Sequence, residues 1–178
     1  MRVVITGAGS VGRSIARELI ENGHSVLLVD RAPDVVQRAS VEGAQWLLAD
    51  AAEIARARRY LLVGSLRVDV DDPEWMPPAD VGEVFAAYLR AKAASERDLR
   101  ARELDWTVLR PGRLTDDDPT GRVLLAEPGV VERADISRAD VAALLVALLD
   151  EPRTARRTLE AVAGDTPIAD AVRAVAGE

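Results

Sequence analysis

Arg2-Val-Val-Ile-Thr6 leads directly into Gly7-Ala-Gly-Ser-Val-Gly12, so a continuous apolar run ends in a glycine-rich turn. β-Branched residues without a polar interruption are typical of a parallel strand that is buried on both faces. Residues 14–22 then place apolar side chains on one helical face, and they end before Gly23, which is suited to a helix C-terminus. The stretch predicts a strand, a glycine turn and a helix in direct succession.

A second apolar run follows the predicted helix. Ser25-Val-Leu-Leu-Val29 reads as a strand and ends at Asp30. A β-α-β unit with a glycine turn after its first strand and an acid at the end of its second is typical of dinucleotide-binding folds. Asp30 would accept hydrogen bonds from the adenosine ribose and repel a 2′-phosphate, whereas Arg31 would offset part of that repulsion. The sequence therefore favours NAD as the cofactor and leaves NADP as an alternative.

Each glycine of the turn has a physical task if a dinucleotide binds. Gly7 permits the tight turn, Gly9 lets the backbone approach the pyrophosphate, and Gly12 lets the helix pack closely on the strand. The first N–H groups of the helix have no partner within it, so they can bind an anion. The alternative is a turn that serves close packing alone. The predicted cofactor-binding residues in this half are Gly7, Gly9, Ser10, Val11, Gly12, Asp30 and Arg31.

Composition limits the remaining possibilities. At 178 residues the chain has the length of one domain, for which we expect a dinucleotide-binding half over residues 1–50 and a second half over residues 59–178. A net charge of -7 argues against a nucleic-acid partner. The absence of cysteine and the single histidine argue against a thiolate or histidine metal site, and we expect no metal.

Hydropathy argues against a membrane. The longest later apolar run, residues 141–149, is far shorter than the ~20 residues that span a bilayer, and the first residues lack the longer apolar core of a signal peptide. We therefore expect a cytoplasmic protein without a membrane partner.

The second half of the chain carries candidate chemistry. Arg59-Tyr-Leu-Leu-Val-Gly-Ser65 predicts a buried strand, with Ser65 at its carboxyl end, where open α/β sheets bind ligands. Residues 66–82 are rich in aspartate and proline and predict a long irregular segment. Residues 83–103 predict a helix. We expect its apolar face to comprise Val84, Ala87, Tyr88, Ala91, Ala94 and Leu99.

Tyr88 and Lys92 stand four positions apart in the predicted helix, so they lie on the same face one turn apart. Lys92 is the only lysine among the 23 basic residues. An ammonium group near the phenol would favour the phenolate and lower the pKa of Tyr88 below its usual ~10. The alternative is an ordinary aromatic residue at the core edge and a solvated charge.

Together with Ser65, this pair resembles the Ser and Tyr-x-x-x-Lys pattern of the short-chain dehydrogenases/reductases. The similarity is greatest to their atypical NAD(P)H-binding branch, which is NAD-dependent epimerase/dehydratase-like, and it extends over residues 59–164. The run Leu104-Asp-Trp-Thr-Val-Leu-Arg-Pro-Gly-Arg-Leu114 is similar to that branch's strand and Arg-Pro-Gly loop, which adds Pro111 as a cofactor contact. Ile136-Ser-Arg-Ala-Asp-Val-Ala142 is similar to its later helix start.

The resemblance implies an oxidoreductase that acts on a small carbonyl or hydroxyl compound with NAD(P) as cofactor. In that family pattern Tyr88 is the general acid/base, Ser65 orients the substrate oxygen, and Lys92 binds the nicotinamide ribose.

The first fifty residues resemble a different family, the NAD-binding domain of potassium-uptake regulators of the TrkA type. The similarity lies in Gly7-Ala-Gly-Ser-Val-Gly-Arg-Ser-Ile-Ala-Arg-Glu-Leu19 and in Val41-Glu-Gly-Ala-Gln-Trp-Leu-Leu-Ala-Asp50. Two alternative functions follow. One is a nucleotide-sensing regulatory module without catalysis, and the other is a structural chimera or deletion variant, natural or engineered, with impaired cofactor binding.

The segment between Asp30 and Arg59 is too short for a complete reductase fold. If residues 44–49 form a third strand, residues 51–59 must cross to the next parallel strand, although such crossovers usually take about a dozen residues or more. Either the crossover is made between two chains, as a homodimer with exchanged segments, or residues 41–58 form one long helix. The predicted fold class is therefore α/β, a Rossmann-like doubly wound parallel sheet shortened by at least one βα unit.

The last third of the chain predicts simpler elements. Residues 122–126 and 158–163 read as strands, and residues 166–175 as a final helix. Ser137-Arg-Ala-Asp140 is similar to a capping box with aspartate in the place of glutamate, and it precedes an amphipathic helix that Pro152 stops.

Overall fold

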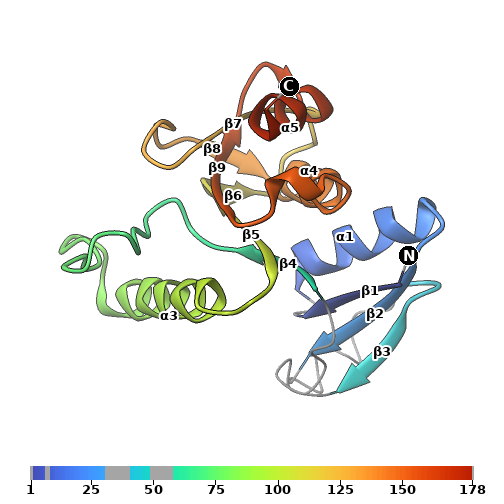
Figure 1. Ribbon diagram of the computed structural model, residues 1–178, viewed down its shortest axis with the longest axis horizontal. Coiled ribbons are helices and arrows are strands. Elements are labelled where there is room, and N and C mark those ends of the chain that lie inside the picture. The colour runs from blue at the N-terminus through green and yellow to red at the C-terminus, as the bar shows by residue number, and fades with distance from the viewer. Residues whose placement is uncertain (1, 7–8, 31–40, 49–57, 178) are drawn as a thin grey trace.

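A computed structural model describes residues 2–6, 9–30, 41–48 and 58–177, which fold into strands and helices (Figure 1). The described strands are β1 (Arg2–Thr6), β2 (Ser25–Asp30), β3 (Gln45–Leu48), β4 (Arg59–Val63), β5 (Asp105–Pro111), β6 (Arg113–Thr115), β7 (Arg122–Ala126), β8 (Asp135–Ser137), β9 (Arg157–Ala163) and β10 (Thr166–Pro167). The described helices are α1 (Ser10–Glu21), α3 (Glu83–Arg100), α4 (Arg138–Leu149) and α5 (Ile168–Ala176), with a 3-10 turn at Pro152–Thr154. The predicted α/β class is confirmed.

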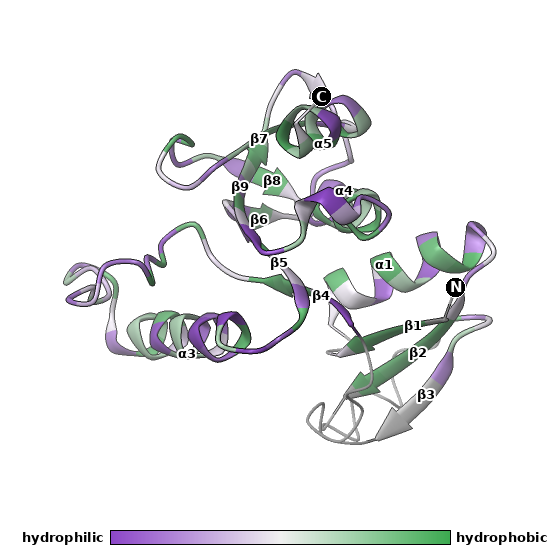
Figure 2. Ribbon diagram, viewed as in Figure 1, coloured by the Kyte–Doolittle hydropathy of each residue, from purple (hydrophilic) through white to green (hydrophobic). Residues whose placement is uncertain are grey.

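The N-terminal strands form a parallel sheet in the order β1-β2-β3. Figure 2 shows hydrophobic residues along β1 and β2, as the continuous apolar runs predicted. Helix α1 begins after Gly9 and buries Ala16 and Leu19 against Ile5 and Leu28 of the sheet. The strand, turn and helix sequence is therefore confirmed, and Gly7 lies outside the described residues.

Residues 45–48 form a strand, so the alternative of one long helix over residues 41–58 is wrong. The turn before this strand contains Gly43 at φ +84°, a conformation that a continuing helix does not adopt. β3 then pairs in parallel with residues 27–30 of β2, a non-local contact that outweighs helical spacing in the sequence. Most of the expected crossover, residues 51–57, lies outside the described residues.

A second sheet has the order β10-β7-β9-β5-β4, in which β4, β5 and β9 are parallel, β7 is antiparallel to β9, and the short edge strand β10 is antiparallel to β7. Side chains alternate along the central strands, so each strand contributes to both faces. Leu61 and Leu109 belong to the core beneath α4 and α5, whereas Leu62 and Val108 pack with Leu99 of α3. Helices therefore cover both faces of this sheet, as in a doubly wound fold.

The described strands do not form one continuous sheet, because no backbone ladder joins β1 to β4 among them. The predicted fold lacks at least one βα unit, and the strand of that unit would lie between β1 and β4. Packing between α1 and α4 links the two sheets instead. Val11 and Ile15 of α1 pack against the core of the second sheet, and Val146 of α4 lies in the core of the first.

The start of α4 follows the predicted capping pattern in part. The hydroxyl oxygen of Ser137 accepts a hydrogen bond from the backbone N–H of Asp140 at 2.9 Å. The Asp140 carboxylate returns to the start of the helix through the side chain, because the Ser137 hydroxyl donates a hydrogen bond to it at 2.9 Å. The carboxylate also accepts hydrogen bonds from the N–H groups of Thr120 and Gly121 at 3.0 Å and 2.8 Å, and so fixes the loop before β7. The helix begins at Arg138, three residues before the apolar run.

Gly112 offers a direct test of packing at the end of β5. A Cβ atom on this residue would lie 2.0 Å from the Ala134 carbonyl oxygen and 3.0 Å from Cγ1 of Val162. We expect Gly112→Ala to lower the free energy of unfolding by about 3 kcal/mol, because the backbone must move to relieve the overlap. Urea unfolding measures the change.

Gly9→Ala is the matched control, since its Cβ would meet no atom within 4 Å. It should cost less than about 1 kcal/mol, the scale of a changed helix N-cap. Equal losses for the two variants would contradict this view of the packing.

Candidate functional site

Ser65 lies at the carboxyl edge of the second sheet, as predicted. The N–H of Gly64 donates to the carbonyl of Leu109 at 2.7 Å, and the N–H of Leu66 donates to the carbonyl of Pro111 at 3.2 Å. The backbone on either side of Ser65 is therefore tied to the end of β5. The half-buried Ser65 side chain faces the backbone N–H of Arg67 at a long 3.5 Å, which leaves its hydroxyl available to a ligand.

Tyr88 and Lys92 lie on one side of α3, and Lys92 joins that helix to the serine strand. Its Nζ donates a hydrogen bond to the carbonyl oxygen of Val63 at 2.7 Å, two residues before Ser65. The same Nζ lies 5.5 Å from the centroid of the Tyr88 ring. The structure thus brings the segments that carry the three predicted catalytic residues to one sheet edge.

The prediction that Lys92 lowers the pKa of Tyr88 is wrong. Partial burial raises the pKa of the Tyr88 phenol, and burial lowers the pKa of the Lys92 ammonium. The physical reason is burial, which disfavours the charged form of each group, while the Lys92 ammonium donates its hydrogen bond to a carbonyl oxygen. The Tyr88 hydroxyl is accordingly protonated at neutral pH, which suits a proton donor.

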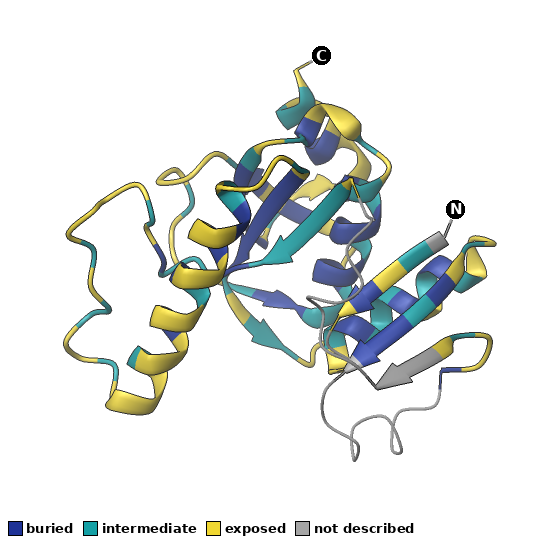
Figure 3. Ribbon diagram, turned by 60° about the horizontal axis from the view of Figure 1, so that its bottom comes forward, coloured by how far each residue is buried: buried dark blue, intermediate teal, exposed yellow. Residues whose placement is uncertain are grey.

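The apolar face predicted for α3 is also wrong at most of its positions. Val84 is 89 % exposed and Tyr88 is 45 % exposed, and much of the helix is exposed in Figure 3. The exposed members of the predicted face also include Ala87, Ala91 and Ala94. The buried positions are Leu89, Ala93, Glu96 and Leu99. The buried face could not be recognised as apolar, because it includes a carboxylate.

That carboxylate, Glu96, forms a buried two-point ion pair with Arg110 of β5. Arg110 Nη2 and Nε donate to its two oxygens at 2.7 Å and 3.1 Å, and the two side chains are 0 % and 2 % exposed. Arg110 Nη1 also lies 3.8 Å from Glu160 Oε1, and Glu160 accepts the N–H of Gly129 at 2.9 Å. Sequence reasoning missed Glu96, although its position one turn after Lys92 was a usable signal.

The long segment over residues 66–82 packs against α3. Val68 is buried with Leu89 and Ala93 of the helix, and Trp75 packs against the same cluster. Arg100 donates to both carboxylate oxygens of Asp71 at 2.7 Å and 3.1 Å, a contact that lowers the pKa of that carboxyl. A small apolar core and an ion pair therefore hold this segment beside the site.

The start of α1 fits the pyrophosphate of a dinucleotide. Gly9 is the N-cap, no side chain caps the helix, and no acid lies in its first turn. The first bond within the helix runs from the N–H of Arg13 to the carbonyl of Gly9, so the N–H groups of Ser10, Val11 and Gly12 have no partner in the helix. The open space at Gly9 would allow an anion to approach the backbone closely.

Packing relates this helix start to the rest of the candidate site. Val11 in the first turn of α1 and Val63 at the end of β4 pack against one core cluster, so the start of α1 and the strand that leads to Ser65 share a core. Pro111, predicted to contact the cofactor, ends β5 at the carboxyl edge of the second sheet and is buried. Asp30 ends β2, but its side chain and all of Arg31 lie outside the described part of the structure.

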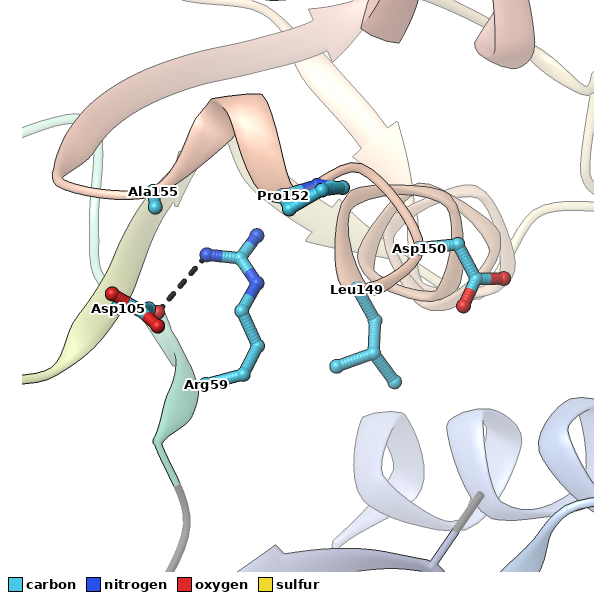
Figure 4. A pocket seen from close by; sticks show the side chains of 6 residues that line it. All are labelled: Arg59, Asp105, Leu149, Asp150, Pro152 and Ala155. Atoms are coloured by element: carbon cyan, nitrogen blue, oxygen red, sulfur yellow. Dashed lines mark hydrogen bonds between the residues drawn. The ribbon is translucent and has the colours of Figure 1, made fainter.

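A pocket at the opposite end of these strands has a structural explanation. Arg59, Asp105, Leu149, Asp150, Pro152 and Ala155 line it (Figure 4). The Arg59 guanidinium donates to the carbonyls of Asp105 and Leu148 at 3.0 Å and 2.7 Å and to Thr107 Oγ1 at 2.7 Å. It therefore joins the amino ends of β4 and β5 to α4. Open α/β sheets bind ligands at the other end.

The described residues lack two other kinds of functional feature. They contain no group of three or more His, Cys, Asp or Glu side chains placed to hold a metal ion. None of the helices described is long and apolar enough to cross a membrane.

Comparisons with protein families agree with both sequence resemblances. Residues 46–152 match the model described as NAD(P)H-binding, and residues 3–59 match the TrkA-N domain. The two matches meet within and after β3, where the chain is shorter than the predicted fold requires.

Curated relatives divide in the same way. The uncharacterized sugar epimerase YhfK of Bacillus subtilis is 36 % identical over 124 residues, which cover 70 % of this chain and 54 % of that protein. The Trk system potassium uptake protein TrkA of Mycobacterium tuberculosis is 49 % identical over 55 residues, which cover 31 % of this chain and 25 % of that protein. The chain thus spans about half the length of the first relative and a quarter of the second.

Solved structures share the fold over nearly the whole chain. The oxidoreductase ylbE from Lactococcus lactis has a TM-score of 0.79 at 18 % identity, over 100 % of this chain and 98 % of that one. ChuY, an anaerobillin reductase from Escherichia coli O157:H7, has a TM-score of 0.73 at 22 % identity, over 93 % and 98 % of the two chains. At these identities the likeness shows the Rossmann-like fold.

Loss of the ion pair between Glu96 and Arg110 should destabilise the fold, because both side chains are buried. We expect Glu96→Gln to lower the free energy of unfolding by about 3 kcal/mol, because the Arg110 charge is left buried without its main counter-charge. Urea unfolding of the full chain measures the loss.

Glu83→Gln is the matched control, since it removes an exposed carboxylate that pairs with Arg90 on the same helix. Its cost should stay below about 1 kcal/mol. If Glu96→Gln cost no more than Glu83→Gln, the ion pair would not hold α3 on the sheet.

Proposed function

This chain belongs to the NAD(P)H-binding family, and from that premise we propose that it is an oxidoreductase of the atypical short-chain dehydrogenase/reductase type. Its substrate is a small carbonyl or hydroxyl compound. One observation carries the proposal: the hydrogen bond from Lys92 Nζ to the Val63 carbonyl, which joins the Tyr88 helix to the strand that leads to Ser65.

Different residues of the chain bind different parts of the dinucleotide. The N–H groups of Ser10, Val11 and Gly12 bind the pyrophosphate, supported by the uncapped start of α1. Asp30 binds the adenosine ribose and favours NAD, with NADP as the alternative that Arg31 would assist. Two donors of the Lys92 ammonium remain after its bond to Val63, and they serve the nicotinamide ribose, beside Pro111.

When bound, the nicotinamide ring supplies the hydride that reduces a carbonyl carbon. Ser65 donates a hydrogen bond that orients the carbonyl oxygen, and Tyr88 transfers its phenolic proton to that oxygen. Because burial raises the pKa of Tyr88, the protonated form that this step needs prevails at neutral pH.

The second candidate is a nucleotide-sensing module without catalysis, like the TrkA-type domain. It is favoured by the 49 % identity of a 55-residue segment to TrkA of Mycobacterium tuberculosis. A homodimer with exchanged segments is a further proposal, supported by the missing ladder between β1 and β4 in the described residues. A chimera with impaired cofactor binding is the remaining alternative for the same divided sheet.

Replacement of Tyr88 tests the catalytic proposal. We expect Tyr88→Phe to lower kcat for NADH-dependent carbonyl reduction by at least about a hundredfold, the usual contribution of a positioned proton donor. NADH oxidation is followed by absorbance on a panel of aldehydes and ketones.

Tyr60→Phe is the control, because Tyr60 is the only other tyrosine and packs in the core beneath α3. The kcat of the Tyr60→Phe variant should equal that of the unmodified protein. Equal rates for the Tyr88 variant and the unmodified protein would remove Tyr88 from the mechanism, and binding of NADH without any turnover would favour the sensing module.

A further inference from the structure

A row of stacked side chains extends from the proposed proton donor along the surface. The Tyr88 ring stacks on Phe85, with 5.5 Å between centroids and 19° between planes. The guanidinium carbon of Arg67 then lies 5.7 Å from the Phe85 centroid. Lys92 closes the other end of the row beside Tyr88. The row is therefore cation, ring, ring and cation, and only its Tyr88 end has a role in the proposed reaction.

Arg67 differs from the other arginines near this surface. Arg90 pairs with Glu83 and Arg100 pairs with Asp71, whereas the Arg67 side chain has no acidic or hydrogen-bonding partner within the described part of the chain. A guanidinium that lies over a ring presents its face to the ring and keeps its edge donors available. Those donors match the two oxygens of a carboxylate.

The two rings provide an apolar surface next to this cation. Phe85 is 42 % exposed and Tyr88 is 45 % exposed, although aromatic side chains are usually more deeply buried. Arg67 is also only two residues from Ser65, the other residue proposed to contact the substrate oxygen. Arg67 as an anion-binding group and Tyr88 as a proton donor therefore both contact the Phe85 ring, at 5.7 Å and 5.5 Å from its centroid.

We propose that the substrate is an aromatic carbonyl compound that carries a carboxylate. Arg67 binds the carboxylate through two N–H groups, the aromatic ring lies across the exposed part of the Phe85 and Tyr88 side chains, and the carbonyl group reaches Tyr88 and Ser65. This substrate class rests on the proposed function, because it takes Tyr88 as the proton donor. The reaction is the one already described: the hydride adds to the carbonyl carbon and the Tyr88 proton to its oxygen, while the carboxylate stays unchanged.

Binding measurements test the proposal independently of turnover. Calorimetric titration of the full chain, with and without NAD, which cannot reduce an aldehyde, compares 4-formylbenzoate with benzaldehyde, which lacks the carboxylate. We expect the unmodified protein to bind 4-formylbenzoate at least about tenfold more tightly, as one charge-assisted pair provides. Arg67→Gln should abolish that preference, and Arg67→Lys should retain part of it because the charge remains.

Arg90→Gln is the matched control, since it removes a neighbouring guanidinium on α3 that is already paired. It should keep the full preference, as should Tyr88→Phe, which retains both rings. Equal binding of the two compounds by the unmodified protein, or an unchanged preference in Arg67→Gln, would overturn the proposal. Loss of the preference in Arg67→Gln together with no reduction of either compound would support the anion site and refute the proposed catalysis.

Discussion

The buried ion pair between Glu96 and Arg110 determines where the candidate catalytic residues lie. It fixes α3 against β5 at a point one turn beyond Lys92. Arg110 also lies directly against the residue before Ser65, because a Cβ on Gly64 would be 3.1 Å from Arg110 Cγ. Desolvation makes such a pair a poor source of net stability, so its contribution is best understood as positional. Helix α3 is otherwise largely exposed, and few apolar contacts would hold it in place.

The second constraint is the packing of α1 on α4. No ladder joins β1 and β4 among the described strands, so this helix pair is what relates the dinucleotide-binding half to the half that carries the proposed chemistry. Val11 belongs to both halves of the molecule, because it lies in the first turn of α1 and packs on the core of the second sheet. A doubly wound fold that lacks one βα unit thereby keeps the start of α1 and the carboxyl end of β4 on one core.

Features that depend on neighbouring residues could be predicted from the sequence, whereas features that depend on contacts between distant segments could not. The β1 strand, the glycine turn and α1 depend on hydrophobic periodicity and glycine placement within a few residues, and Tyr88 and Lys92 follow from helical spacing and resemblance. The buried face of α3 was missed because Glu96 reads as a solvated charge until a distant strand supplies Arg110. The pKa of Tyr88 was predicted in the wrong direction because burial raises it, and the burial of the phenol depends on the folded chain.

We propose that two halves with different relatives still form one dinucleotide site. Calorimetric titration of the full chain with NADH, NADPH and AMP tests it most directly, since AMP can occupy only the adenosine half. We expect NADH to bind at least about tenfold more tightly than AMP, because its nicotinamide half adds contacts beside Lys92 and Pro111. We also expect weaker binding of NADPH, because Asp30 repels the 2′-phosphate. NADH that binds no more tightly than AMP, or does not bind, would contradict the claim.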